Sequence, residues 1–413
     1  GDHHRCVASG RDLTAHVGGT TPRAHADAIV IGAGPGGLAA AAELGRRGLS
    51  VVVLERADRP GFSWTRHYDR LHLHTARGLS GLPGFGIPRR YGRWVARDDV
   101  VAYLGEYAQR HELDVHTAIS ADRIDREADG WAVSWSKTGL RGQTEGTSEP
   151  DAEATTAGKI VAPIVVVATG YNHTARLPRL PGIDDYRGTL VHSSEYRNPA
   201  ALGARDVLVV GPGNSGAEIA ADLAESGARV RMAVRTPPNI VTRSVLGIPS
   251  QALVISMDWM PVRAQDRMAA MLQKLTVGDL RKYGLAKAPR GLATQQIRDD
   301  VTPTLDVGML SALRAGKITV VPAVVGFDGD EVLLADGARI RPEAVVFATG
   351  FSRGLEPLVG HLDVLGAKGR PRVNAEDQLP EHPGLYFIGY SNPLAGNFRQ
   401  IAIDARKIAR AAA

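Results

Sequence analysis

The sequence contains almost no cysteine: Cys6 is the only one among its 413 residues. No disulfide can form within the chain, and no Cys-x-x-Cys redox pair exists. This absence excludes enzymes that reduce disulfides through a cysteine pair of their own. It is also typical of proteins kept in a reducing compartment, so a cytoplasmic location is expected.

Long hydrophobic runs are also missing. No apolar segment approaches the roughly 20 residues that cross a bilayer, so no membrane span is predicted. The net charge is only +5 and the arginines are scattered, so no nucleic-acid partner is predicted. No metal site is predicted either. Residues 1–26 are polar, lack the apolar centre of a signal peptide, and are interpreted as an N-terminal extension.

Glycine, in contrast, is abundant, with 47 residues, and two glycine-rich loops match each other. The motif Gly-x-Gly-x-x-Gly occurs at 32–37 and again at 211–216. Each copy follows an apolar strand and opens a helix, so backbone N–H groups can approach a pyrophosphate at the helix N-terminus. Two such cradles predict two dinucleotides. The predicted contacts are Gly32, Gly34, Pro35, Gly36 and Gly37 in the first cradle, and Gly211, Gly213, Asn214, Ser215 and Gly216 in the second.

The residues that end the next strand distinguish the two sites. Strand 51–54 runs into Glu55, whose carboxylate accepts hydrogen bonds from ribose hydroxyls and repels a 2′-phosphate. Strand 229–234 ends instead in Arg235 and Thr236, and a guanidinium pairs well with a 2′-phosphate. The first cradle is therefore expected to hold FAD or NAD, and the second NADPH.

The order of these units predicts an α/β fold of two interleaved Rossmann-type dinucleotide-binding domains. The FAD-binding domain is expected to span residues 27–185 and 326–413. The NADPH-binding domain, residues 186–325, is expected to lie between these two parts of the chain. It carries a helical insertion at about 240–305.

Several other segments carry weaker patterns. The turns 168–171 and 348–351 both begin with Ala-Thr-Gly and are interpreted as crossings between the domains, where backbone packs against a nucleotide. Segment 257–275 is rich in methionine at helical spacing and is interpreted as core or subunit contact, which leaves a homodimer open. Residues 137–159 are interpreted as an exposed loop. Further expectations are a short strand at 69–75 with His72 and His74 on one face, a buried strand at 161–167, a helix at 306–313, and a closing helix at 397–411 against the first cradle.

Together with the two cradles and the two Ala-Thr-Gly turns, the run Tyr-x-Gly-x-x-x-His-x-x-x-Tyr at 186–196 resembles the class B flavin-containing monooxygenases. Stretches such as 71–73 and 246–249 are most similar to the YUCCA branch, which oxidatively decarboxylates indole-3-pyruvate. The resemblance implies that NADPH reduces FAD and that O₂ then adds to flavin C4a. The resulting (hydro)peroxyflavin inserts one oxygen atom into a small organic substrate, by N-hydroxylation or by oxidative decarboxylation of a carboxylate-bearing compound.

Three alternatives to this activity stay open. Tyr196 stands where the Baeyer–Villiger monooxygenases have Trp, which makes that reaction less favoured. The protein could also be an NADPH oxidase that releases peroxide, or a nucleotide sensor without enzymatic activity. His192 is interpreted as structural, orienting the link between the domains.

The resemblance also suggests where substrate and oxygen meet. The family's Asn beside the flavin has no counterpart at 72–77, so His74, Thr75 and Asn397 are the candidate catalytic residues. Between residues 66 and 97 there are seven arginines against one acid, and Arg77 and Arg93 are the candidates for binding a substrate carboxylate. Further cofactor contacts are expected from Arg56, Trp64, Leu73, Thr169, Gly170, Tyr171, Gly350 and Gly389.

Overall fold

The structure of the protein is a computed structural model that describes residues 21–128, 130–137 and 156–413. The predictions for residues 1–20, including Cys6, and for most of the 137–159 loop lie outside the described residues. Within the described ranges, no helix is long and apolar enough to cross a membrane.

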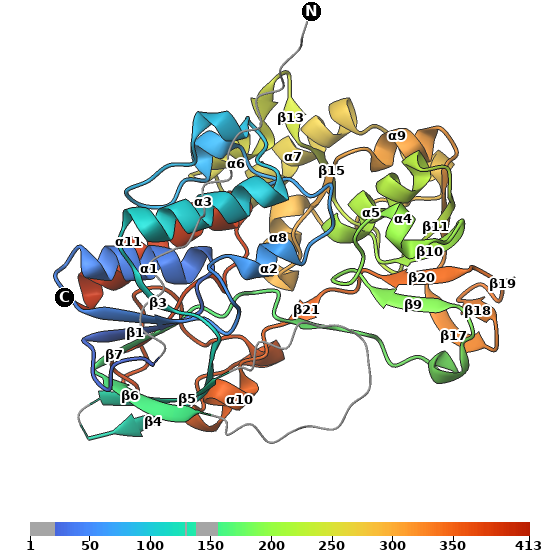
Figure 1. The fold of residues 1–413 in the computed structure, drawn as a ribbon. Helices are drawn as coiled ribbons and strands as arrows, with labels where there is room; N and C mark the ends of the chain where they lie inside the picture. The colour runs from blue at the N-terminus through green and yellow to red at the C-terminus, as the bar shows by residue number, and fades with distance from the viewer. Residues whose placement is uncertain (1–20, 129, 138–155) are drawn as a thin grey trace, which may run out of the picture.

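The first of two large sheets has five parallel strands in the order β22-β7-β1-β2-β3. Helices α1, α3 and α11 cover one face, and a three-stranded antiparallel sheet, β4-β5-β6, covers the other (Figure 1). The strand bounds are β1 Ala28–Ile31, β2 Val51–Leu54, β3 Asp114–His116, β4 Ile119–Glu127, β5 Gly130–Lys137, β6 Ala157–Ala162, β7 Ile164–Val167 and β22 Leu385–Phe387; the helices are α1 Pro35–Gly45, α2 Phe62–Thr65, α3 Arg97–Arg110, α10 Glu356–Val359 and α11 Asn397–Ala411.

The second sheet repeats this plan. Its five parallel strands lie in the order β16-β11-β10-β20-β9. Helices α5 and α9 pack on one face and the antiparallel sheet β17-β18-β19 packs on the other. The bounds are β9 Thr189–His192, β10 Asp206–Val210, β11 Arg229–Ala233, β16 Ile318–Val321, β17 Val324–Asp328, β18 Glu331–Leu334, β19 Arg339–Ile340 and β20 Ala344–Phe347, with α4 Pro199–Leu202, α5 Asn214–Glu225 and α9 Met309–Arg314.

The predicted fold class is confirmed, but one boundary is placed too early. The chain leaves the first sheet after β7, builds the second sheet, and returns for β22. Strand β20 pairs with β10 and β9, so the second sheet extends to residue 347 rather than ending at 325. The error arises because β7 and β20 are both short, fully buried apolar strands that run into the same Ala-Thr-Gly turn, and only the pairing distinguishes them.

The two crossings between the sheets are paired with each other. Strand β8 (Thr174–Ala175) follows the first Ala-Thr-Gly turn, and β21 (Phe351–Ser352) follows the second. These strands form an antiparallel ladder that joins Phe351 with Ala175. The chain therefore crosses out of the first unit and back into it along adjacent paths, as Figure 1 shows for β21.

In the view of Figure 1, the helices of the insertion lie between α3 of the first unit and α5 of the second. The insertion begins with β12 (Ile240–Thr242) and ends with β15 (Thr304–Asp306), which pair in parallel. The segments between them are β13 Ser244–Val245, β14 Ile248–Pro249, α6 Ser250–Met257, α7 Val262–Thr276 and α8 Leu292–Asp299.

The structure corrects the prediction for 257–275. Two helices replace one, because Pro261 stands at the N-cap of α7 and α6 has already ended at Met257. The interpretation of the methionine-rich face as core is wrong, since α7 has no buried residue. Trp259 is 83% exposed and Leu275 is 76% exposed. No described element covers this face.

Of four smaller predictions of strands and helices, the structure changes three and confirms one. Segment 161–167 forms two strands, since Pro163 separates β6 from β7 where the chain passes between sheets. Segment 69–75 forms only an isolated bridge, from His72 to Ala96. Segment 306–313 is divided between the end of β15 and the start of α9. The closing helix is confirmed as α11, which packs against α1.

Gly37→Ala tests a close approach inside the first cradle. A Cβ atom at residue 37 would lie 1.8 Å from the Gly32 carbonyl oxygen, so the start of α1 would have to move away from the loop. The free energy of unfolding is expected to fall by about 1–3 kcal/mol, with loss of bound flavin, as measured by urea denaturation and by flavin content.

The matched control is Gly45→Ala at the last residue of the same helix. A Cβ atom there meets no atom within 4 Å, so stability should stay unchanged or rise by up to about 1 kcal/mol. Equal destabilisation by both substitutions would contradict the steric account.

Candidate functional site

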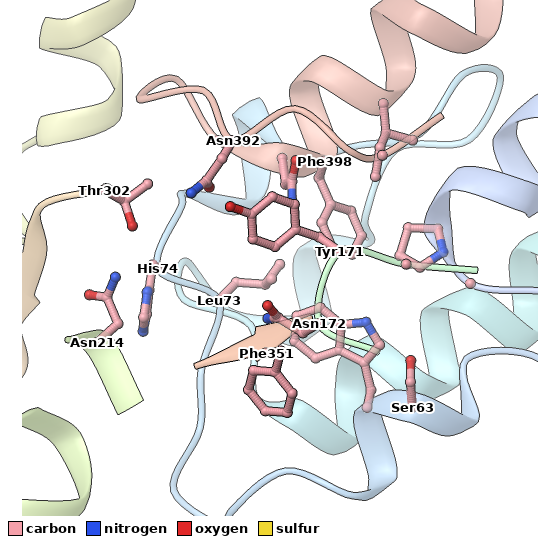
Figure 2. A pocket seen from close by; sticks show the side chains of 18 of the residues that line it. Ser63, Leu73, His74, Tyr171, Asn172, Asn214, Thr302, Phe351, Asn392 and Phe398 are labelled. Atoms are coloured by element: carbon pink, nitrogen blue, oxygen red, sulfur yellow. The ribbon is translucent and has the colours of Figure 1, made fainter. Parts of the chain in front are cut away.

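A large cavity lies between the first unit, the start of α5 and the insertion, and Figure 2 shows side chains from several segments of the chain around it. Its volume is about 1830 Å³, whereas pockets for small ligands typically measure roughly 300–1,000 Å³. Residues of both cradles line it. One continuous space therefore reaches the expected positions of both dinucleotides.

The first cradle presents open backbone to this cavity. Gly32 has φ +103° and its N–H donates to the Leu54 carbonyl oxygen at 2.7 Å. Gly34 is the N-cap of α1, and no atom lies within 4 Å of where its Cβ would be. Helix α1 begins at Pro35, which has no N–H to leave unpaired. This arrangement suits a pyrophosphate at the helix N-terminus.

Glu55 lies at the end of β2, where the sequence predicts it. Its two carboxylate oxygens accept backbone N–H bonds from Ala33 at 2.7 Å and from Ala57 at 2.9 Å. Burial raises the pKa of the Glu55 carboxyl, against the opposite effect of these two N–H groups. A carboxylate has about four acceptor positions, so two remain for ribose hydroxyls. The neighbouring Arg56 guanidinium contacts His173 Nε2 at 3.0 Å.

The two Ala-Thr-Gly turns pack against the cradles rather than only against bound nucleotides. A Cβ atom on Gly32 would lie 2.6 Å from the Ala168 carbonyl oxygen, and one on Gly211 would lie 2.6 Å from that of Ala348. Both first glycines have positive φ. Each cradle is thus held by the same backbone contact.

The second cradle is tied to the insertion. The Asn214 side chain accepts a hydrogen bond from the Leu305 N–H at 2.7 Å and donates to the Pro303 carbonyl oxygen at 3.2 Å. Asn214 and Ser215 both line the cavity. The amide of Asn214 therefore fixes the end of the insertion against the start of α5.

Some predicted cofactor residues line the cavity and others do not. Arg235 and Thr236 are exposed at the end of β11, and the Arg235 side chain has no partner among the described residues. Those that line the cavity are Gly32, Gly34, Pro35, Gly36, Glu55, Arg56, Trp64, Leu73, Thr169, Gly170, Tyr171, Asn214, Ser215 and Gly389; those that do not are Gly37, Gly211, Gly213, Gly216, Arg235, Thr236 and Gly350.

His74 is paired with an acid that the sequence analysis missed. Its Nε2 lies 2.6 Å from Glu218 Oε1, and Glu218 is only 2% exposed. Glu218 lies on α5, two residues after Gly216, so its position on the buried face of the expected helix was a signal for a functional acid. Burial and Glu218 together raise the pKa of the Tyr68 hydroxyl well above its usual value.

Thr75 lies against the segment that leads into Asn397. A Cβ atom on Gly396 would lie 2.5 Å from Thr75 Cγ2, so the segment before Asn397 packs directly on Thr75. Asn397 begins α11, and its Oδ1 is buried with no hydrogen-bond partner among the described residues. Thr75 and Asn397 both line the cavity.

Gln251 connects these segments to the insertion. Its Oε1 accepts the Ala76 N–H at 3.0 Å and its Nε2 donates to the Ala395 carbonyl oxygen at 2.6 Å. Gln251 is 6% exposed. No local pattern could have identified this residue, because its partners lie far away in the sequence.

Arg77 and Arg93, predicted to bind a substrate carboxylate, are not among the residues that line the cavity. Arg77 donates to the Ile87 carbonyl oxygen at 3.2 Å, and Arg93 donates to that of Gly247 at 2.5 Å. Both guanidinium groups therefore hold loops together. His192 has the structural surroundings expected of it, with its ring nitrogens contacting Ser194 Oγ and the Gly350 carbonyl oxygen.

A family model described as flavin-binding monooxygenase-like matches residues 26–361 of this chain. Indole-3-pyruvate monooxygenase YUCCA8 of Oryza sativa subsp. japonica is 32% identical over 372 residues, covering 88% of this chain and 86% of that protein. "Probable indole-3-pyruvate monooxygenase YUCCA8" of Arabidopsis thaliana is 31% identical over 388 residues, covering 92% of this chain and 87% of that protein.

Solved structures are similar over nearly the whole chain. A flavin-containing monooxygenase from Stenotrophomonas maltophilia has a TM-score of 0.69 and 25% identity, with 94% of this chain and 98% of that chain covered. Cyclohexanone monooxygenase bound to epsilon-caprolactone has a TM-score of 0.67 at 17% identity, covering 94% and 87%. The second likeness concerns the fold alone.

His67, which lines the cavity, predicts that acid lowers the free energy of unfolding. Burial, with the charges of Arg197 and Arg97, lowers the pKa of His67 from 6.5 to about 4. The unfolded chain then binds a proton that the folded chain does not, so the free energy of unfolding should fall as pH drops from about 6.5 to about 4. The slope from this residue is at most about 1.4 kcal/mol per pH unit.

Urea denaturation at several pH values measures this slope. A His67→Gln variant should have a shallower slope between these pH values and the same slope as the unsubstituted protein above pH 7. Identical slopes throughout would show that His67 is not a buried neutral imidazole.

Proposed function

This chain belongs to the flavin-binding monooxygenase-like family, and on that basis we propose that it oxidatively decarboxylates a small 2-oxo acid. The protein is a flavin-dependent monooxygenase, an oxidoreductase whose cofactors are FAD and NADPH. The identity of the substrate is the proposal. The relatives named as indole-3-pyruvate monooxygenases support an aromatic 2-oxo acid of that type.

The proposed reaction balances as R–CO–COO⁻ + O₂ + NADPH + H⁺ giving R–COO⁻ + CO₂ + NADP⁺ + H₂O. The bond between the two carbonyl carbons breaks, and the original carboxylate leaves as CO₂. One atom of O₂ enters the new carboxylate and the other becomes water. NADPH supplies the two electrons as hydride, and the FAD supplies the activated oxygen once it is reduced.

The observation that carries the proposal is the single cavity that joins the open first cradle to the start of α5. It receives residues from the first sheet, from the start of α5 and from the insertion, and apolar residues of α6, namely Leu253, Val254 and Met257, form part of its wall. Such a wall limits access of water to the reacting atoms. It also suits the apolar body of an aromatic substrate.

We assign positions at the centre of this cavity to the three candidate catalytic residues. Glu218 Oε1 lies 2.6 Å from Nε2 of His74, so the Nδ1 atom is the ring nitrogen left to face the reacting atoms. Asn397 offers an amide whose oxygen has no protein partner among the described residues. The Thr75 hydroxyl accepts a hydrogen bond from Ser80 Oγ at 2.7 Å. These groups hold and orient the reacting atoms rather than supply oxygen themselves.

Arg235→Ala tests the choice of nicotinamide cofactor. The exposed guanidinium at the end of β11 should pair with the 2′-phosphate, so its loss should weaken NADPH binding by about 1–3 kcal/mol while NADH is spared. Arg229→Ala is the matched control, because Arg229 is exposed at the other end of the strand and its partner is Asp206. Equal weakening of NADPH and NADH would refute this role for Arg235.

The substrate proposal is tested by the stoichiometry of the purified holoenzyme with NADPH, O₂ and indole-3-pyruvate. Catalase is included, because free hydrogen peroxide decarboxylates 2-oxo acids without an enzyme. We expect one CO₂ for each NADPH oxidised, and one atom from ¹⁸O₂ in the new carboxylate. NADPH oxidation at the same rate with and without the 2-oxo acid, all of it yielding peroxide, would contradict the proposal.

A further inference from the structure

Four arginines line the cavity, and three of them are either engaged with protein atoms or exposed. Arg56 contacts His173 Nε2 at 3.0 Å. Arg197 donates to two backbone carbonyl oxygens at 3.1 and 3.0 Å. Arg66 is exposed. The fourth is Arg243, which directly follows β12 at the start of the insertion.

Arg243 is held in place without having its charge neutralised. Its guanidinium lies over the Trp94 ring, 4.7 Å from the ring centroid. Among the described residues, its side chain donates one hydrogen bond, a long one of 3.5 Å to the Leu73 carbonyl oxygen. Its Nε is buried with no partner, and no carboxylate lies within ion-pair distance among the described residues. The charge of Glu218 acts on Arg243, but Glu218 already contacts His74.

Burying part of a cation costs desolvation free energy unless an anion pairs with it. Burial lowers the pKa of Arg243, but a guanidinium stays protonated in proteins. The planar fork that Trp94 supports leaves N–H groups that match a carboxylate in two parallel bonds. The site therefore lacks one anionic partner.

The surrounding wall indicates the shape of that partner. Between residues 241 and 305, Arg243 is the one charged side chain that lines the cavity. Its cavity-lining neighbours include Val241, Val245 and Leu253, while the hydroxyl of Thr242 is buried with no partner among the described residues. The wall thus places one cation among apolar and uncharged polar residues.

We infer that Arg243 binds the carboxylate of the substrate and so selects acids over their neutral analogues. This inference rests on the proposed function, because the proposed reaction determines which acid is used as the probe. It places the carboxylate beside Leu73 and His74, between the candidate catalytic groups and the apolar face of α6. Arg243 is a binding residue here, and it takes the role that the sequence had assigned to Arg77 and Arg93.

The test compares binding of indole-3-pyruvate and of its primary amide to the oxidised holoenzyme by isothermal titration calorimetry. The unsubstituted protein should bind the acid about 10- to 100-fold more tightly than the amide, the range expected for a hydrogen-bonded charge. Arg243→Gln should remove this preference by weakening the acid alone. Arg243→Lys should keep part of the preference for the acid, because the positive charge remains but the planar guanidinium, with its two parallel N–H groups, is lost.

Arg93→Gln is the control, since Arg93 lies 5.5 Å from the same Trp94 ring but outside the cavity lining. It should keep the full preference for the acid. The inference is overturned if Arg243→Gln keeps that preference, if the unsubstituted protein has none, or if the substitution weakens NADPH binding and leaves the ratio of acid to amide unchanged. The last result would assign Arg243 to a cofactor phosphate.

Binding is measured without turnover, so the carboxylate site at Arg243 and the decarboxylation reaction are tested independently of each other. Acid preference that depends on Arg243, without release of CO₂ during turnover, supports the carboxylate site and refutes the decarboxylation. Release of CO₂ with an acid preference that does not depend on Arg243 supports the decarboxylation and refutes the site.

Discussion

The rest of the structure depends on a backbone contact that occurs twice, between the first and last glycine of each cradle. A Cβ atom at Gly37 would lie 1.8 Å from the Gly32 carbonyl oxygen, and one at Gly216 would lie 1.9 Å from that of Gly211. Only glycine permits this approach, which brings the start of a helix directly onto the loop. The carbonyl groups of Ala168 and Ala348 then pack on the two first glycines. Each unit thereby fixes a helix N-terminus at the carboxyl end of its sheet, where we expect a dinucleotide to bind.

The cavity exists because the insertion joins these two fixed points. Asn214 ties the start of α5 to the segment that ends the insertion, and Gln251 ties α6 to the segments around Thr75 and Asn397. Asp300, which follows α8, is paired with Arg353 and Arg370 of the first unit. The insertion is therefore held on three sides by polar contacts, while some of its apolar residues, such as Leu253 and Val254, line the cavity. Such an enclosure is what a reaction with activated oxygen requires, because water competes for the oxidant.

The sequence predicts those parts of this site that depend on local backbone chemistry. Two glycine-rich loops that open helices, Glu55 after β2, Arg235 after β11 and the closing helix α11 follow from short motifs and periodicity, and the structure has these elements at the predicted places. The cofactor contacts of these residues stay predictions. Glu218, Gln251 and Arg243 were missed because their roles come from partners more than a hundred residues away. Arg77 and Arg93 were predicted to bind substrate because they lie in an arginine-rich segment. In the structure, their guanidinium groups donate to backbone carbonyl oxygens of other loops. The boundary at 325 failed for a similar reason, since only strand pairing assigns β20 to the second sheet.

The central claim is that one cavity lets the nucleotide of the second unit reduce the flavin of the first. Anaerobic rapid mixing of the purified holoenzyme with NADPH, followed by flavin absorbance, measures this directly. The account predicts bleaching of the flavin in a single turnover, with NADPH reacting faster than NADH at the same low concentration. Flavin that stays oxidised in the presence of bound NADPH would contradict it, and would leave a protein that binds two nucleotides without transferring electrons between them.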